Sequence, residues 1–276
     1  MESTCFYFQV HQPFRLRDYD FSMIGEDHVY EEKNAALHNY LAESYYLPTN
    51  RLLLNLLKKY KNKLKIVFSI SGCAIEQFAL YRPDVLVSFQ KLAKTGKVDF
   101  LAQTYYHSLS LLYSASEFER QVKKHHDKMT SLFGRQPKNL LFNNNDNICL
   151  DYETFEAGKY NKYLSGYQEF DQLLNEIMTD KQQTFALATV AAQMENSMQK
   201  EAIKRIYSLE EKVLKSKNEN LIDTWGRLQT SDYFHYMSTK ITNDNDVRHW
   251  RSPYSSPFDA YINYMNIISD FEHLLA

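Results

Sequence analysis

The sequence is poor in the residue types that build disulfide frameworks, metal knuckles and flexible linkers. Its 276 residues include only 3 Cys, 7 Gly and 6 Pro. The cysteines form no CxxC pair, so neither a disulfide framework nor a cysteine-ligated metal site is expected, and a reducing cytoplasm fits best. The small number of Gly and Pro, without repeats or low-complexity tracts, argues against a chain of loosely linked modules.

Long apolar runs and a strong charge of one sign are also missing. We find no uninterrupted apolar stretch of membrane-spanning length and no signal peptide, so a cytoplasmic protein is expected. The formal net charge is −2 and the pI is about 6.5. This balance argues against nucleic acid or an anionic membrane as a partner. Aromatic residues, in contrast, are abundant, with 21 Tyr and 17 Phe. Most of these rings should fill the core, although tyrosine rings also stack on sugar faces.

Short apolar segments alternate with helical patterns in the first half of the chain. This alternation predicts an α/β fold with a mainly parallel sheet and crossover helices. The expected strands are Thr4–Val10, Lys65–Ser71, Val98–Ala102, Leu140–Phe142 and Ile148–Leu150. The expected helices are Pro48–Tyr60, Pro83–Thr95 and Ser116–Phe133, the last of them capped by Gly134.

The second half has a different character. Helical patterns cover Tyr160–Met178, Thr184–Lys217, Ile222–Lys240 and Pro257–Leu275. We therefore predict two domains, an α/β domain over residues 1–159 and a helical domain over residues 160–276.

Polar residues follow directly after several expected strands. His11 and Gln12 follow the first strand, and Asp151 and Glu153 stand two positions apart at the end of the last. Residues two apart on a strand face the same side, so this carboxylate pair could do general acid and base chemistry. The alternative is structural, with Asp151 capping a following helix and Glu153 on the surface.

Two further positions can also be interpreted as either functional or structural. Glu76 follows the Gly72 turn after the second strand, where it could support a pocket or simply satisfy a helix dipole. His107 follows the third strand and, like His11, could bind a hydroxyl or serve as an ordinary structural histidine. The segment from Trp225 to Lys240, read as one helix, is unusually dense in polar and aromatic groups.

Taken together, these segments resemble glycoside hydrolase family 57, in its α-amylase-like branch. The resemblance is carried by the HQP segment 6–17, the segment 68–81 with the YYHSL that follows it, the LDYETF segment, and the C-terminal segments 225–240 and 252–271. It implies an incomplete (β/α)7-type barrel followed by a helical domain that packs on the barrel mouth. It also implies retaining cleavage of α-glucans or maltooligosaccharides, with no metal or organic cofactor.

The resemblance also implies residue roles. Asp151 matches the general acid/base, and His11 matches the substrate-binding histidine, with Gln12 beside it. Glu153 would support the acid. Glu76, His107, Trp225 and Asp232 would contribute to substrate binding.

One expected residue has no counterpart. Relatives carry a nucleophilic Glu on a strand before the DYETF motif, whereas here the corresponding run, Asn139 to Asn147, contains no Glu. Relatives also place several dozen residues between these two motifs, so the barrel should be truncated in the middle. Gln103 stands where relatives usually have Glu.

Three interpretations stay open at this point. The first is an α-glucan hydrolase impaired by the missing nucleophile, and the second is a non-catalytic α-glucan-binding or regulatory protein. The third is a metal-dependent deacetylase on a related barrel with His11, His107 and Asp151 as ligands.

Overall fold

The computed structural model describes residues 4–25, 28–60, 64–142, 148–151, 196–239 and 252–275. Two compact units make up the chain, one of residues 1–12 and 34–189 and the other of residues 13–33 and 190–276. The domain boundary predicted near residue 160 lies outside the described residues, so it stays a prediction. Residues 13–33 were assigned to the first domain from the sequence, but they cluster with the C-terminal helices.

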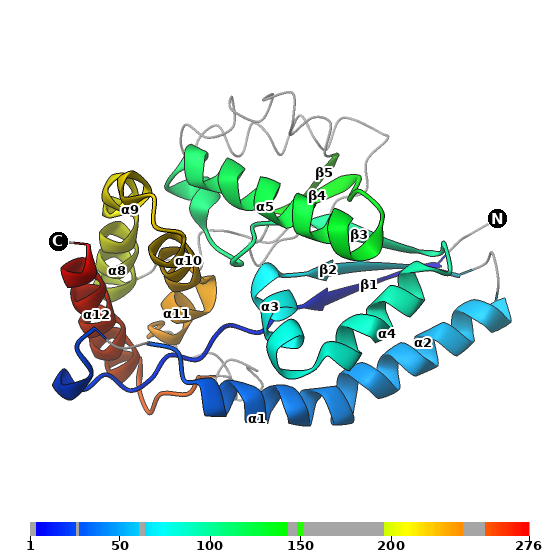
Figure 1. The fold of residues 1–276 in the computed structure, drawn as a ribbon, viewed down its shortest axis with the longest axis horizontal. Coiled ribbons are helices and arrows are strands. Elements are labelled where there is room, and N and C mark those ends of the chain that lie inside the picture. The colour runs from blue at the N-terminus through cyan, green and yellow to red at the C-terminus, as the bar shows by residue number, and fades with distance from the viewer. Residues whose placement is uncertain are drawn as a thin grey trace. The chain divides into compact units, whose positions relative to one another are not determined.

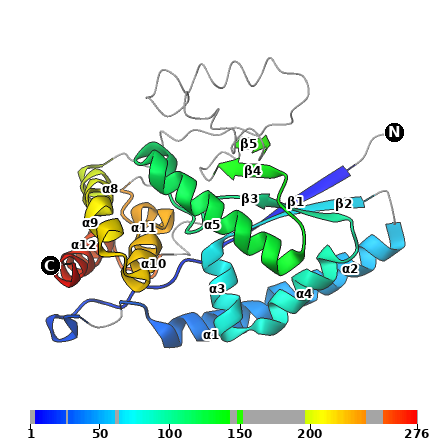
Figure 2. The same ribbon diagram turned by 45° about the horizontal axis from the view of Figure 1, so that its top comes forward.

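The first unit is built on a five-stranded sheet in the order β1-β2-β3-β4-β5 (Figures 1 and 2). The pairings β1–β2, β2–β3 and β3–β4 are parallel. Every expected strand is present with its ends within one residue of the prediction. The strands are β1 Thr4–Val10, β2 Leu64–Ile70, β3 Val98–Ala102, β4 Asn139–Phe142 and β5 Ile148–Asp151.

The last strand departs from the repeating pattern of a parallel barrel. β5 pairs antiparallel with β4, with Asn139 opposite Asp151 and Phe142 opposite Ile148. Only the five residues 143–147 separate the two strands in sequence. A parallel crossover needs a connection of about a dozen residues or more, so a short link forces a hairpin. The mixed α/β architecture is therefore confirmed, whereas the truncated barrel stays a prediction.

Helices cover one face of this sheet. Side chains on one face of β2 and β3 join a single apolar core with residues of α2, α3, α4 and α5, and Phe68 lies at its centre against Phe89 and Phe100. Burying aromatic rings of this size contributes about 1.5–3 kcal/mol each. The helices before and within this layer are α1 Glu31–Leu41, continued by one π-helical turn over Ala42–Tyr46, α2 Leu47–Tyr60, α3 Gly72–Tyr81, α4 Pro83–Ala93 and α5 Ala115–Phe133.

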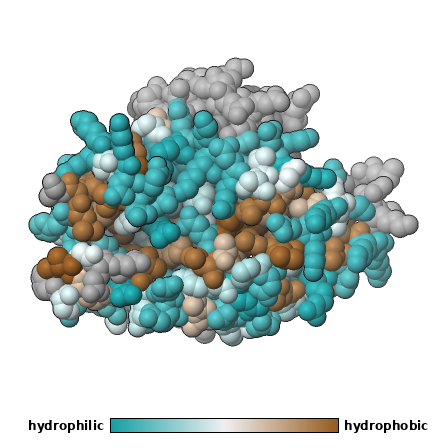
Figure 3. All heavy atoms as spheres, in the orientation of Figure 1, coloured by the Kyte–Doolittle hydropathy of each residue, from teal (hydrophilic) through white to brown (hydrophobic). Residues whose placement is uncertain are grey.

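Helix α5 behaves as its sequence predicts. Ser114 caps its first turn by accepting the backbone N–H of Glu117, and Gly134 ends it in the left-handed conformation at φ 66°. Val122 and Met129 face the core, whereas the outer side of the helix is charged and hydrophilic (Figure 3). Helices α1 and α3 were not among the expected helices.

The second unit is helical, as expected, and the predicted helix Pro257–Leu275 is found within one residue. Two other predicted helices are each divided in two, and Tyr160–Met178 lies outside the described residues. The described part of Thr184–Lys217 forms two helices, and so does the described part of Ile222–Lys240. Thr230 separates the second pair because its ψ of 127° is not helical, and its hydroxyl donates to the carbonyl of Arg227 at 2.8 Å. These helices are α8 Ser197–Ser208, α9 Glu210–Ser216, α10 Glu219–Leu228, α11 Ser231–Tyr236 and α12 Pro257–Leu274.

Residues 13–25 and 28–30 form a strap, with one 3-10 turn at Phe21–Met23, that is tied to these helices by hydrogen bonds. Tyr233 donates its hydroxyl to the carbonyl of Phe14, and Asn263 of α12 accepts the backbone N–H of Tyr19 at 2.6 Å. Farther along, Asp270 accepts the backbone N–H of Gly25 and bonds His28 Nε2 at 2.7 Å. Apolar patterning alone could not show this strap, because its bonds reach more than 200 residues along the chain.

None of the helices in the described ranges combines the length and apolar character that a bilayer crossing requires.

The His28–Asp270 pair generates a stability prediction. Both side chains are almost fully buried, so Asp270→Ala leaves an imidazole and the Gly25 N–H without their acceptor. Removing one partner of a buried pair costs about 3 kcal/mol or more, whereas replacing both with apolar groups costs far less. We expect this loss in urea unfolding followed by tryptophan fluorescence, and a smaller loss for the double variant His28→Leu, Asp270→Leu. His273→Ala, at an exposed position of the same helix, is the control; equal losses for the single and double variants would contradict the pairing.

Candidate functional site

Three neighbouring parallel strands end at the same level. Val10, the last residue of β1, pairs with Ile70, the last residue of β2. Phe68 pairs with Phe100, which brings Ile70 level with Ala102 at the end of β3. The residues that follow these ends are His11, Ser71 and Gln103, and we call them the strand-end row. Ligand sites of α/β proteins form at such carboxyl ends, where polar groups from separate strands converge.

His11 and Ser71 are directly bonded in this row. His11 Nδ1 lies 2.7 Å from Ser71 Oγ. The same oxygen caps α3 by accepting the backbone N–H of Ala74 at 3.2 Å. With Ala74 as its donor, the Ser71 hydroxyl can give its own hydrogen to Nδ1, which leaves the proton of the neutral imidazole on Nε2. The strand-end serine therefore both starts a helix and orients the predicted histidine.

His107 meets His11 face to face. The ring centroids are 3.8 Å apart and the planes differ by 15°. His107 has a φ of 57°, in the left-handed region that non-glycine residues seldom adopt. Such strain persists only where the surroundings impose it, and it clusters at functional sites.

A buried polar network imposes this conformation. Gln121 Oε1 accepts the backbone N–H of Tyr106 at 3.3 Å and the hydroxyl of Ser108 at 2.9 Å, the two neighbours of His107. Gln121 Nε2 in turn donates to Glu117 Oε1 at 2.7 Å. Arg120 forms a two-pronged bond with the same carboxylate at 2.6 and 2.9 Å. Because its members satisfy one another inside the fold, the network can hold a strained loop.

Glu76 is bonded to Tyr105, whose hydroxyl donates to Glu76 Oε1 at 2.9 Å. The helix-dipole interpretation of Glu76 is wrong, since the first turn of α3 contains no acidic residue. Lys124 Nζ lies 4.4 Å from the centre of the Tyr105 ring, which places a cation over that ring. Gly72 permits the approach of Tyr105, because a Cβ at Gly72 would lie only 2.4 Å from ring carbons.

Two residues without a predicted role bond the backbone at the strand ends. Gln77 is fully buried on α3 and donates to the carbonyl of Gln12 at 2.9 Å. This bond is made by the backbone of Gln12, whereas the prediction concerned its side chain. His125 on α5 lies 2.7 Å from the Ile70 carbonyl through Nε2 and accepts the Gln103 N–H through Nδ1 at 3.3 Å. The only sequence signal for these two residues is their place on the buried side of an amphipathic helix, and it does not predict these bonds.

The other predicted residues that the structure describes, Asp151, Trp225 and Asp232, belong to β5, α10 and α11. Asp151 lies on β5 opposite Asn139, which pairs with Leu101 of β3; only its backbone is described. Glu153 lies outside the described residues. Trp225 is fully buried in the helical unit and donates to the Ile206 carbonyl at 2.8 Å, the packing of a core residue. Asp232 stands in the first turn of α11, where its charge suits the helix dipole.

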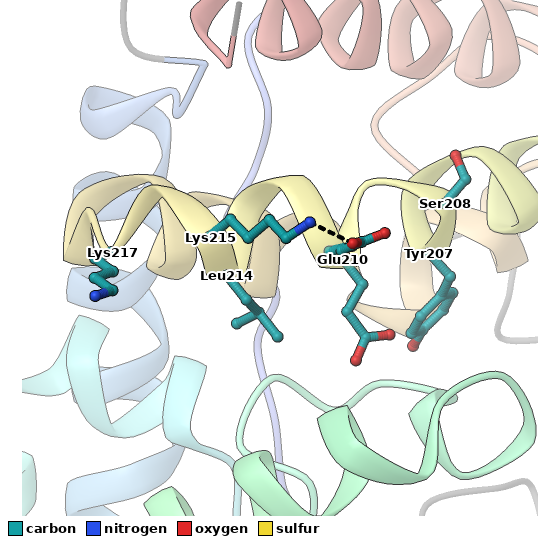
Figure 4. Close-up of a pocket in the computed structure, with 7 residues that line it drawn as sticks. Tyr207, Ser208, Glu210, Leu214, Lys215 and Lys217 are labelled. Carbon is teal, nitrogen blue, oxygen red and sulfur yellow. Dashed lines mark hydrogen bonds and ion pairs between the residues drawn. The ribbon is translucent and has the colours of Figure 1, made fainter.

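A shallow groove of about 670 Å³ lies elsewhere, on α8 and α9 of the helical unit (Figure 4). An exposed ion pair between Lys215 and Glu211 crosses it, and no predicted site residue lines it. Its lining residues are Tyr207, Ser208, Glu210, Glu211, Leu214, Lys215 and Lys217.

Comparison with known proteins gives one family. The family model for glycosyl hydrolase family 57 matches residues 5–146. A protein of Methanocaldococcus jannaschii, described provisionally as an alpha-amylase, is 24% identical over 396 residues that cover 98% of this chain and 84% of the relative. Since this chain has 276 residues, at least 120 of those 396 positions have no counterpart in it.

Two solved structures are also similar over half of this chain. A 4-alpha-glucanotransferase from Thermococcus litoralis is 18% identical with a TM-score of 0.32, and the match covers 50% of this chain and 18% of that one. A GH57-type branching enzyme from Pyrococcus horikoshii is 17% identical with a TM-score of 0.36, covering 50% and 34%. The match thus spans about a fifth and a third of the lengths of these two structures.

His125 generates a pH prediction. Burial, opposed in part by the bond to Ile70, lowers its pKa from 6.5 to about 4. The unfolded chain therefore binds more protons between pH 4 and 6.5, and the free energy of unfolding falls as the solution is acidified. From pH 7 to pH 5 the contribution of this one residue to the loss is about 2 kcal/mol.

His125→Gln removes the titrating group, so the stability difference between wild type and variant should shrink by about that amount over the same range. Urea unfolding at both pH values measures it, with the exposed His273→Gln as control. Parallel pH profiles of wild type and His125→Gln would contradict the assignment.

Proposed function

Because the chain belongs to glycosyl hydrolase family 57, we propose that it binds α-glucans or maltooligosaccharides at the strand-end row and hydrolyses them weakly or not at all. The observation that carries the proposal is the arrangement of His11, held by Ser71 and stacked on the strained His107. The provisional alpha-amylase description of the Methanocaldococcus jannaschii relative supports the substrate class.

The chemistry of the row suits a polyhydroxylated ligand. Neutral imidazoles and hydroxyls donate and accept hydrogen bonds without the desolvation cost of a fixed charge. Glu76, bonded by the Tyr105 hydroxyl, adds an acceptor next to the row. Sugar hydroxyls need this mixture of donors and acceptors, whereas a phosphate ligand would call for a cluster of cations.

Two facts argue against efficient retaining hydrolysis. That mechanism needs two carboxyl groups roughly 5–5.5 Å apart, one as nucleophile and one as acid. The chain has no Glu between Glu119 and Glu153, so β4 carries no glutamate to serve as nucleophile. Asp151, the proposed acid, lies on the fifth strand of the sheet and His11 follows the first, so three strands stand between them.

A purely non-catalytic glucan-binding role is the second candidate. The β4–β5 hairpin favours it, because a direct antiparallel connection leaves out the strands and loops that could bring a second carboxylate to the row. The two candidates share the ligand and differ only in whether a product is formed.

Calorimetry with maltoheptaose and an assay for released reducing sugar test both candidates. We expect binding by the wild type, at least tenfold weaker binding by His11→Ala because its Nε2 contact is lost, and unchanged binding by the exposed control His273→Ala. Little or no reducing sugar should appear.

Robust sugar release that disappears in Asp151→Asn would overturn the impaired-activity proposal and identify Asp151 as the acid. Absence of any maltoheptaose binding would overturn the glucan proposal as a whole.

A further inference from the structure

Gln103 is the third member of the strand-end row, and the proposal above assigns no contact to its side chain. Its position is fixed from behind, since His125 Nδ1 accepts its backbone N–H at 3.3 Å while His125 Nε2 bonds the end of β2. Residues alternate between the faces of a strand, so Gln103 continues the face of Asp99 and Leu101, opposite the helix-covered core that holds Phe100. Its side chain therefore belongs to the same face as Ser69, two residues before Ser71.

The amide of Gln103 stands out for its hydrogen bonding. The residue is fully buried, and neither Oε1 nor Nε2 has a hydrogen-bond partner among the residues that the structure describes. The polar groups that follow it are satisfied: Thr104 bonds both the N–H and the carbonyl of Ser108, and Ser108 bonds Gln121. Each buried polar group left without a partner costs about 1–3 kcal/mol.

A leucine of nearly the same size would avoid this cost, so an amide at this position calls for a reason. A carboxamide presents one acceptor and one donor in a single plane. Two adjacent hydroxyls of a sugar ring match this pair, one donating to Oε1 and the other accepting from Nε2. A carboxylate would offer acceptors only, and a cationic side chain would offer donors only.

We propose that Gln103 is a specificity residue that binds two adjacent hydroxyls of a glucosyl unit lying over His11 and Ser71. This inference rests on the proposed function and deepens it, since it selects ligands with a free vicinal diol. It also explains the unpartnered amide, whose hydrogen bonds are completed by the ligand.

Gln103→Leu tests the inference with two readouts. Calorimetry should show maltoheptaose binding about tenfold or more weaker than that of the wild type, because two buried hydrogen bonds are lost. The melting temperature without ligand should stay the same or rise, because the variant removes unpaired polar groups. Gln90→Leu is the matched control: the Gln90 amide donates to the Leu132 carbonyl at 3.1 Å, so that variant should lose stability and keep its affinity.

Three results would overturn the inference. Equal affinities of wild type and Gln103→Leu would do so while leaving the proposed function intact. A melting temperature for Gln103→Leu lowered as much as that of Gln90→Leu would show that the amide has a structural partner. Failure of the wild type to bind maltoheptaose would remove both the inference and the proposed function.

Discussion

The parallel pairing of β1, β2 and β3 is the constraint on which the site depends. Full pairing between β1 and β2 makes these strands end together, and the β2–β3 register brings the end of β3 to the same level. A shift of one residue in either register would turn the side chains of that strand to the other face. The apolar core under Phe68 opposes such a shift, because it would expose residues that are now buried. The same core that stabilises the sheet therefore aligns His11, Ser71 and Gln103.

Helix α5 fixes the end of the third strand, as strand pairing fixes the ends of the first two. Its outer face is solvated, but its inner face carries Gln121 and His125 as well as apolar residues. Gln121 holds the loop of His107, and His125 ties the end of β2 to the start of that loop. Buried polar groups of this kind are costly unless they are paired, so their pairing makes the loop geometry specific rather than adaptable.

The short connection between β4 and β5 fixes the direction of the last strand. Five residues allow a hairpin and exclude a crossover helix, so the sheet gains an antiparallel strand where a barrel would continue. Compared with its Methanocaldococcus jannaschii relative, the chain lacks at least 120 aligned positions.

The sequence by itself determined the strands, the capped helix α5, the family and the placement of His11 and His107 after strands, because periodicity, caps and motifs are local signals. Only the tertiary structure decided that the strap around His28 joins the helical unit, that β5 runs antiparallel, and that Trp225 packs as a core residue. It also showed that the buried Gln103 amide has no partner among the described residues, and that Gln77 and His125 bond the backbone at the strand ends. Those features depend on contacts between residues far apart in the chain, and neither hydrophobic period nor propensity records such pairings.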